Sequence, residues 1–194
     1  MKKLYATFLM SLMICILLAG CISSPEKHYF QLNLLPPKNS LDISFDQVML
    51  VESVKTDDLY DDYRIIYRLS PFQLNYYPYD FWADKPAVII RDSIIHYLKI
   101  GGFFKKVIKE FSRGEPDLIL RSRLHFIEEV DQEIQWYARL SMDLEIIDFR
   151  TEEIKINHHF DRMERMEYKK VSEVPRIISR ILEEELEKIL KQLQ

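Results

Sequence analysis

Histidine side chains are the first candidates for chemistry in this chain of 194 residues, which contains five of them. His158 and His159 are adjacent, in a stretch whose alternating apolar residues predict a strand. Successive side chains of a strand point to opposite faces, so these two imidazoles cannot bind one metal ion without breaking the strand. The spacing therefore predicts no metal site, with one imidazole packed and the other exposed.

Acidic side chains gather in two segments, residues 57–62 and residues 128–133. The first segment lacks the alternating ligands, the glycine and the distal glutamate of a calcium loop, so we interpret it as a solvated turn. The second segment contains Glu128 and Glu129, and we interpret it as the tip of a hairpin. Proximity in sequence alone does not establish a carboxylate pair for glycoside cleavage.

Composition excludes several functional classes. Only four glycines are present, with no glycine-rich loop for a nucleotide phosphate and no Gly-x-Ser-x-Gly nucleophile elbow. The formal net charge of −4 gives no basic surface for nucleic acid. No active site is visible, so we expect a protein that is not an enzyme, needs no cofactor and does not bind nucleic acid.

The two cysteines lie near the amino terminus. A basic start precedes an apolar run from Phe8 to Leu18, which is too short to span a bilayer as a helix and is typical of a signal peptide. The run ends in Leu-Leu-Ala-Gly-Cys at positions 17–21, which resembles the lipobox of bacterial lipoproteins. We therefore expect residues 1–20 to be a signal peptide and Cys21 to be the lipidated first residue of the mature chain.

Lipidation would make Cys21 a permanent anchor. A diacylglycerol on its thiol and an acyl chain such as palmitate on its amino group give two or three chains, whereas one chain binds a membrane only marginally. Cys15 leaves with the signal, so the mature chain has no free thiol and no disulfide. Residues 21–27 form a lipidated tether that reaches at most about 20 Å. By analogy with the enterobacterial sorting rule, Ile22 in place of Asp favours the outer membrane over the inner one.

Residues 28–194 are predicted to form a single α+β domain. Short strands are expected at residues 28–34, 48–54, 64–69, 72–77 and 104–109. Three longer alternating stretches, at residues 118–126, 134–146 and 154–160, predict an antiparallel meander. Helices are expected from Lys85-Pro86 to the Gly101-Gly102 pair and from about Ser172 onward, each with an apolar stripe. We therefore predict a two-layer sandwich of a mainly antiparallel sheet with both helices packed on one face.

Residues 76–82 are unusually aromatic, and they lie just before the first expected helix. The aromatic residues are Tyr76, Tyr77, Tyr79, Phe81 and Trp82. Such side chains suit a protein core, a partner-binding patch or a lipid-contacting surface. Core packing and helix anchoring are favoured, and the five residues stay candidates for partner or lipid contact.

Several short motifs lie between residues 64 and 107, which we call the central block. They follow the lipobox and an early strand that contains Tyr29. They are Arg64-Ile65-Ile66-Tyr67-Arg68, Leu74-x-Tyr76-Tyr77, Trp82-Ala83-x-x-Pro86, Leu98 and Gly102-x-Phe104-x-x-Val107. Together they resemble the ABC-type transport auxiliary lipoprotein family, the PqiC-like lipoproteins associated with MCE transport systems. The resemblance extends over essentially the whole chain, although the later strands match only in pattern. Gly101 stands where the family has a more polar residue.

The resemblance implies a fold like the amino-terminal domain of TolB and no catalysis in this subunit. It also implies a periplasm-facing lipoprotein that works with an MCE-domain protein, an ABC permease and an ATPase to move phospholipids or related molecules between membranes. We expect this chain to dock the MCE assembly at the outer membrane, as a single copy or as a ring of copies. The alternatives are a carrier that shields acyl chains between sheet and helices, and an envelope enzyme with a pocket assembled from distant residues.

Replacement of the anchor residue tests the lipobox directly. The Cys21→Ser chain should lose its membrane association, because a hydroxyl cannot take the thioether-linked lipid and no basic patch compensates. Fractionation of envelopes, followed by metabolic labelling with a palmitate analogue, measures the change. Cys15→Ser is the matched control and should stay lipidated and membrane-bound. Equal labelling of the two variants would contradict the assignment.

Overall fold

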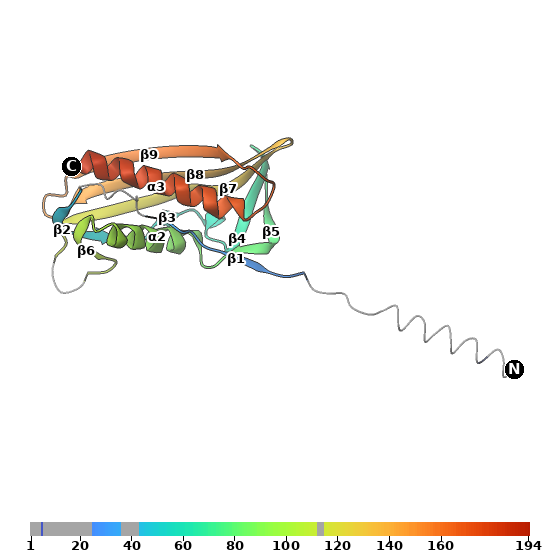
Figure 1. Cartoon of the computed structure of the whole chain (residues 1–194), viewed down its shortest axis with the longest axis horizontal. Helices are drawn as coiled ribbons and strands as arrows, with labels where there is room; N and C mark the ends of the chain where they lie inside the picture. Colours follow the sequence, from blue (N-terminus) through green and yellow to red (C-terminus); the bar gives the residue numbers. More distant parts are fainter. Residues whose placement is uncertain (1–4, 6–24, 36–42, 112–114) are drawn as a thin grey trace.

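The computed structural model describes residue 5 and residues 25–35, 43–111 and 115–194. Within these ranges it contains one curled sheet of nine strands and two long helices (Figure 1). The expected lipobox, with Cys15 and Cys21, lies outside the described residues. No helix in the described part is long and apolar enough to cross a membrane.

Strand β7 (Leu118–Gln132) is the centre of the sheet. One edge of β7 pairs antiparallel with β8 (Gln135–Asp148) over almost its whole length, and β8 pairs in turn with β9 (Ile154–Arg165). The antiparallel meander predicted from the alternation is therefore confirmed. Its three strands are also longer than their apolar patterns indicated.

The other edge of β7 is shared by three short parallel strands. They are β2 (Phe45–Val51), β3 (Lys55–Thr56) and β4 (Arg64–Ser70), placed one after another along β7. On one side the sheet then continues with β6 (Phe104–Ile108), which pairs with β2. On the other side β5 (Gln73–Trp82) pairs with β4, and β1 (His28–Phe30) pairs with β5. The parallel pairings are short and the antiparallel ones long, so the sheet is mainly antiparallel, as predicted.

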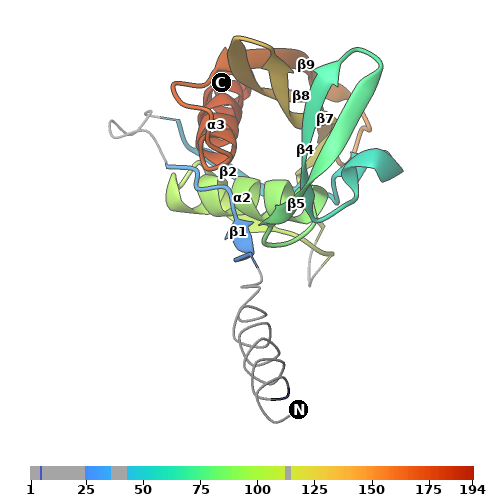
Figure 2. The same ribbon diagram turned by 90° about the vertical axis from the view of Figure 1, so that its right-hand side faces the viewer.

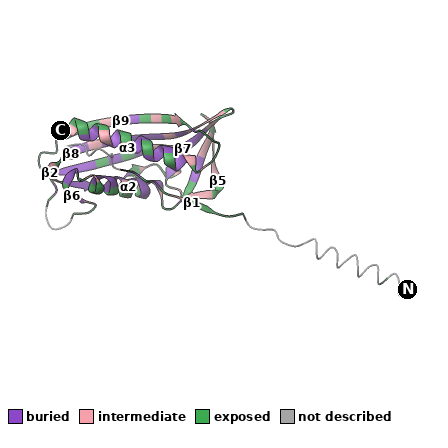
Figure 3. Cartoon of the chain, viewed as in Figure 1, coloured by how far each residue is buried: buried purple, intermediate pink, exposed green. Residues whose placement is uncertain are grey.

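Helices α2 (Pro86–Ile100) and α3 (Glu173–Leu193) both lie inside the curl of the sheet, as Figure 2 shows. Each helix carries both buried and exposed residues (Figure 3). The apolar stripe of α3 is fully buried at Ile178, Ile181, Leu182 and Leu186, and it faces β8 and β9. Burial of such side chains contributes about 1.5–3 kcal/mol each, so this layer holds the domain together. The α+β class is confirmed.

Helix α2 begins and ends where its sequence signals indicated. Pro86 occupies the first turn, and the helix ends at Ile100, just before the two glycines. Gly101 is needed for space, because a Cβ there would collide with the buried ring of Phe103. Gly102 has a φ of 65°, a backbone conformation that favours glycine.

Four expectations about single segments need correction. Of residues 128–133, only Glu133 lies in the turn between β7 and β8, because β7 continues to Gln132, and both Glu128 and Glu129 are at most 1% exposed. Ile134, expected on the buried face, lies in the turn and is 81% exposed. Strand β5 runs to Trp82 and includes the whole aromatic segment, whereas β1 ends already at Phe30.

Candidate functional site

The carboxylate of Glu128 lies fully buried on β7 and is contacted by polar groups from three other elements. Arg68 on β4 donates from Nε and Nη2 to the two carboxylate oxygens, at 2.8 and 2.9 Å. The Tyr60 hydroxyl, from the 3₁₀ turn η1 (Asp58–Tyr60), donates to Oε2 at 2.7 Å. Arg139 on β8 lies 3.5 Å from Oε1. These contacts fasten η1 over the sheet face opposite the helices and link β4 to β7 and β8.

The protonation states of this cluster are fixed by burial and by the shared carboxylate. Burial raises the pKa of the Tyr60 hydroxyl, and its hydrogen bond to Glu128 raises it further, so the hydroxyl remains a donor. The hydrogen bond to Glu128 raises the pKa of Arg68, which keeps its charge. Tyr60 and Arg68 therefore both act as hydrogen-bond donors to the shared carboxylate.

The aromatic segment of β5 is divided between the interior and the surface. Trp82 is 1% exposed and belongs to the core. The Tyr77 hydroxyl donates to the buried Glu129 at 3.0 Å, and the Tyr76 hydroxyl donates to the Leu59 carbonyl at 3.3 Å. The core interpretation therefore holds for Trp82, and Tyr76 and Tyr77 are anchored by internal hydrogen bonds.

Phe81 and Tyr79 keep exposed surface near the place where the tether joins the domain. The Phe81 ring stacks on Tyr29 of β1 with 5.6 Å between centroids, and the Lys27 ammonium lies 5.7 Å from the Phe81 centroid. Tyr29 is 65% exposed and Tyr79 is 41% exposed. Of the five aromatic candidates, Tyr79 and Phe81 therefore remain available for contact with lipid or a partner.

A groove of about 950 Å³ lies between the turn that joins β4 to β5 and the turn that joins β7 to β8. Its lining includes Leu69, Pro71, Phe126, Val130 and Met163, together with Arg68 and Arg139. Phe72 and Ile134, in the two turns, are 99% and 81% exposed. We call Leu69, Phe72, Ile134 and Met163 the apolar end. Strand β1 pairs with Asp80–Trp82, at the end of β5 away from the β4–β5 turn, so β1 and this turn lie on opposite sides in Figure 2.

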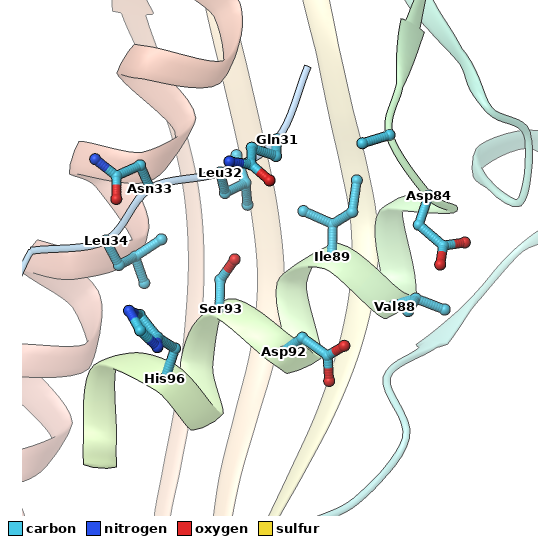
Figure 4. Close-up of a pocket in the computed structure, with 11 residues that line it drawn as sticks. Gln31, Leu32, Asn33, Leu34, Asp84, Val88, Ile89, Asp92, Ser93 and His96 are labelled. Atoms are coloured by element: carbon cyan, nitrogen blue, oxygen red, sulfur yellow. The ribbon is translucent and has the colours of Figure 1, made fainter. Parts of the chain in front are cut away.

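A smaller cavity of about 350 Å³ lies between residues 31–34 and α2. Asp92, Ser93 and His96 project from α2 beside it, and Asp84 lies near the start of the helix (Figure 4). Asp84, Asp92 and His96 are exposed to solvent, so their charges are screened. This cavity brings together no arrangement of groups suited to catalysis.

The adjacent histidines point to opposite faces of β9, as predicted. His158 Nε2 lies 2.7 Å from Glu185 of α3, whereas His159 Nδ1 lies 2.7 Å from Asp143 on the other face. His125 of β7 also contacts Asp143, at 2.6 Å. Sequence spacing missed this third histidine, because only the strand register brings His125, Asp143 and His159 together.

Comparisons with known proteins identify the fold. No protein-family model and no curated protein matches the chain. A crystal structure from Xanthomonas campestris, described by the family model DUF330, superposes with a TM-score of 0.71 at 15% identity, over 86% of this chain and 94% of that one. An uncharacterized protein gives 0.70 at 13% identity, over 88% and 100%. A hypothetical protein of Chlamydia trachomatis gives 0.51 at 8% identity, over 77% and 98%.

The buried carboxylate of Glu129 generates a prediction about stability. Burial raises its pKa above the ordinary 4.5, in part against the hydrogen bond from Tyr77, so the ionised form is the one that costs free energy. This cost is absent below pH 4.5 and grows as the pH rises through the folded-state pKa. Glu129→Gln keeps an acceptor for Tyr77 without a charge and should raise the thermal midpoint at pH 7.

Thermal unfolding followed by circular dichroism at pH 7 and at pH 4 measures the effect of Glu129→Gln. The gain should shrink at pH 4, where the wild-type carboxyl is neutral in both folded and unfolded chains. Glu110→Gln, at an exposed position, is the control and should change little at either pH. A lower midpoint for Glu129→Gln at pH 7 would show that the ionised carboxylate stabilises the fold.

Proposed function

We propose that the chain is a lipid-anchored, non-catalytic subunit of an MCE- and ABC-type lipid transport system in the periplasm, where it docks the MCE assembly at the outer membrane. The lipobox ending at Cys21 and the motifs of the central block support this family context. The polar clusters of the described residues support a non-catalytic role, because Glu128, Glu129 and Glu185 each accept hydrogen bonds from structural partners.

The apolar end is the observation that carries the docking role. Phe72 is 99% exposed and Ile134 is 81% exposed, yet each lies in a hairpin turn, where polar residues are the rule. The groove between these turns adds Leu69 and Met163, which are 41% and 45% exposed. Exposed apolar side chains around a groove are typical of a site that another protein covers.

The apolar end lies across the domain from the proposed anchor. Strand β1, which follows the proposed tether, pairs with Asp80–Trp82 at one end of β5, whereas the turn that contains Phe72 adjoins the other end of β5, so β1 and this turn lie on opposite sides in Figure 2. The proposed tether between Cys21 and the domain reaches at most about 20 Å. It would hold the β1 side near the lipid surface and leave the apolar end free for a tube or tunnel that approaches the outer membrane.

The carrier alternative is favoured by one observation and opposed by two others. The groove has apolar walls, but the guanidinium groups of Arg68 and Arg139 in its lining pair with Glu128 and Asp161, and Asp131 and Glu133 also line it. The layer between helices and sheet leaves no room for an acyl chain beside Leu140, Met142 or Leu144, which are 0% exposed. A carrier would therefore have to use the groove. Phospholipid that copurifies in stoichiometric amounts, detected by mass spectrometry, would favour the carrier.

A charged residue at the apolar end should disrupt docking. We expect the Phe72→Asp, Ile134→Asp double variant to lose at least about tenfold of its copurification with the proposed MCE partner, because carboxylates in an apolar interface lose their hydration. Both side chains are almost fully exposed, so the fold should not change. Copurification from detergent-solubilised envelopes measures the loss.

Ile154→Asp is the matched control, because Ile154 is 51% exposed at the start of β9, at the opposite end of the domain (Figure 1). The control should copurify like the wild type. Both variants should still sediment with membranes through the anchor. Normal recovery of the MCE protein with the double variant would contradict docking through the apolar end, and equal loss in both variants would contradict its location.

A further inference from the structure

Three neighbouring strands bring two imidazoles and a carboxylate together on the sheet face opposite the helices. Asp143 of β8 is the register partner of His159 on β9. The register between β7 and β8 shifts between Leu124 and Phe126, so His125 is the extra residue of a β-bulge. Bulges redirect side chains, and this one places His125 beside Asp143.

The distances within this cluster are short. His125 Nε2 lies 2.6 Å from Asp143 Oδ2, and His159 Nδ1 lies 2.7 Å from Asp143 Oδ1. One atom from each of the three side chains can be chosen so that all lie within 4.8 Å of one another. The carboxylate thus stands between two imidazoles that come from different strands.

Neighbouring arginines are engaged with other carboxylates. Arg139 donates to both oxygens of Asp161, at 2.8 and 2.6 Å. Arg123, the register partner of Asp143, forms its ion pair with Asp57 at 3.8 Å. Asp143 is therefore left to the two histidines, whose hydrogen bonds outweigh the effect of burial and hold its pKa below the ordinary range.

We propose that His125, Asp143 and His159 form a binding site for Zn²⁺. Two imidazole nitrogens and one carboxylate oxygen are a ligand set typical of zinc sites that keep a coordination position open. The inference departs from the absence of a metal predicted from His158 and His159 alone, because the second imidazole comes from β7. It is independent of the proposed docking function.

Small movements of the three side chains would let them accept the ion. Zinc–nitrogen distances of about 2.0–2.1 Å place tetrahedral ligands about 3.3 Å apart. Atoms as far apart as 4.8 Å must therefore approach by roughly 1.5 Å, whereas a nitrogen hydrogen-bonded to Asp143 at 2.6 or 2.7 Å must move slightly away from that oxygen. A cavity of about 430 Å³, lined by both imidazoles and by Ser141 and Asp161, opens beside them. This cavity leaves room for water or an external ligand at the fourth position.

Isothermal titration calorimetry with Zn²⁺ on the full lipid-anchored chain in detergent tests the site. We expect one Zn²⁺ per chain, and a loss of affinity of at least about tenfold for His125→Ala, for Asp143→Asn and for His159→Ala, since even outer-shell partners of zinc are worth about 10–100-fold. In nitrogen-15 spectra of the histidine rings, Zn²⁺ should shift the signals of His125 and His159.

His28→Ala is the matched control, because His28 also lies beside a carboxylate, with Nδ1 3.0 Å from Asp80, but in a pair without a second histidine. This control should bind Zn²⁺ like the wild type. Circular dichroism confirms that each variant is folded. Absence of saturable Zn²⁺ binding to the wild type would overturn the proposal. So would an affinity for Zn²⁺ in the three ligand variants equal to that of the wild type.

Discussion

The structure depends on the two hydrogen-bonding edges of β7. One edge is used along almost its whole length by β8, and the other is divided among β2, β3 and β4. Strands β2, β3 and β4 must therefore each fit against a particular part of β7. The sheet curls around α2 and α3 (Figure 2). The face away from the helices carries the Glu128 cluster and the cluster of His125, Asp143 and His159.

A buried ion pair at Glu128 and a buried hydrogen bond at Glu129 secure the part of the domain where the proposed function resides. Glu128 connects η1, β4 and β8, and Glu129 holds Tyr77 of β5. Removal of one partner from a buried ion pair typically costs about 3–5 kcal/mol, so the β4–β5 hairpin is held firmly on the sheet. A rigid hairpin can present Phe72 and Leu69 to a partner with little loss of conformational entropy on binding.

Local patterns predicted the elements well, but not the contacts between distant segments. Pro86 and the glycine pair located α2 because helix ends obey local stereochemical rules. The alternation of β8 identified the buried face, since a half-buried strand must alternate. Glu128 and Glu129 were misplaced because their partners, Tyr60, Arg68 and Tyr77, lie about 50 to 70 positions away in the chain.

The candidate sites show the same limit. The aromatic composition of residues 76–82 did not separate the buried Trp82 from the exposed Tyr79, because the division depends on what covers each face of β5. The His125 cluster depends on a bulge, which shifts the register by one residue without a signal in the composition. The apolar end became visible only when two turns, about 60 residues apart in the chain, were found at one groove.

Site-specific photo-crosslinking in living cells tests the docking claim most directly. If the chain docks an MCE assembly as proposed, a photoreactive side chain in place of Phe72 should form a covalent adduct with the MCE protein. The same side chain in place of Ile154, at the far end of the domain, should form none. An adduct at position 72 with phospholipid alone, while the MCE protein is present and intact, would contradict docking and identify the apolar end as a lipid-contacting surface.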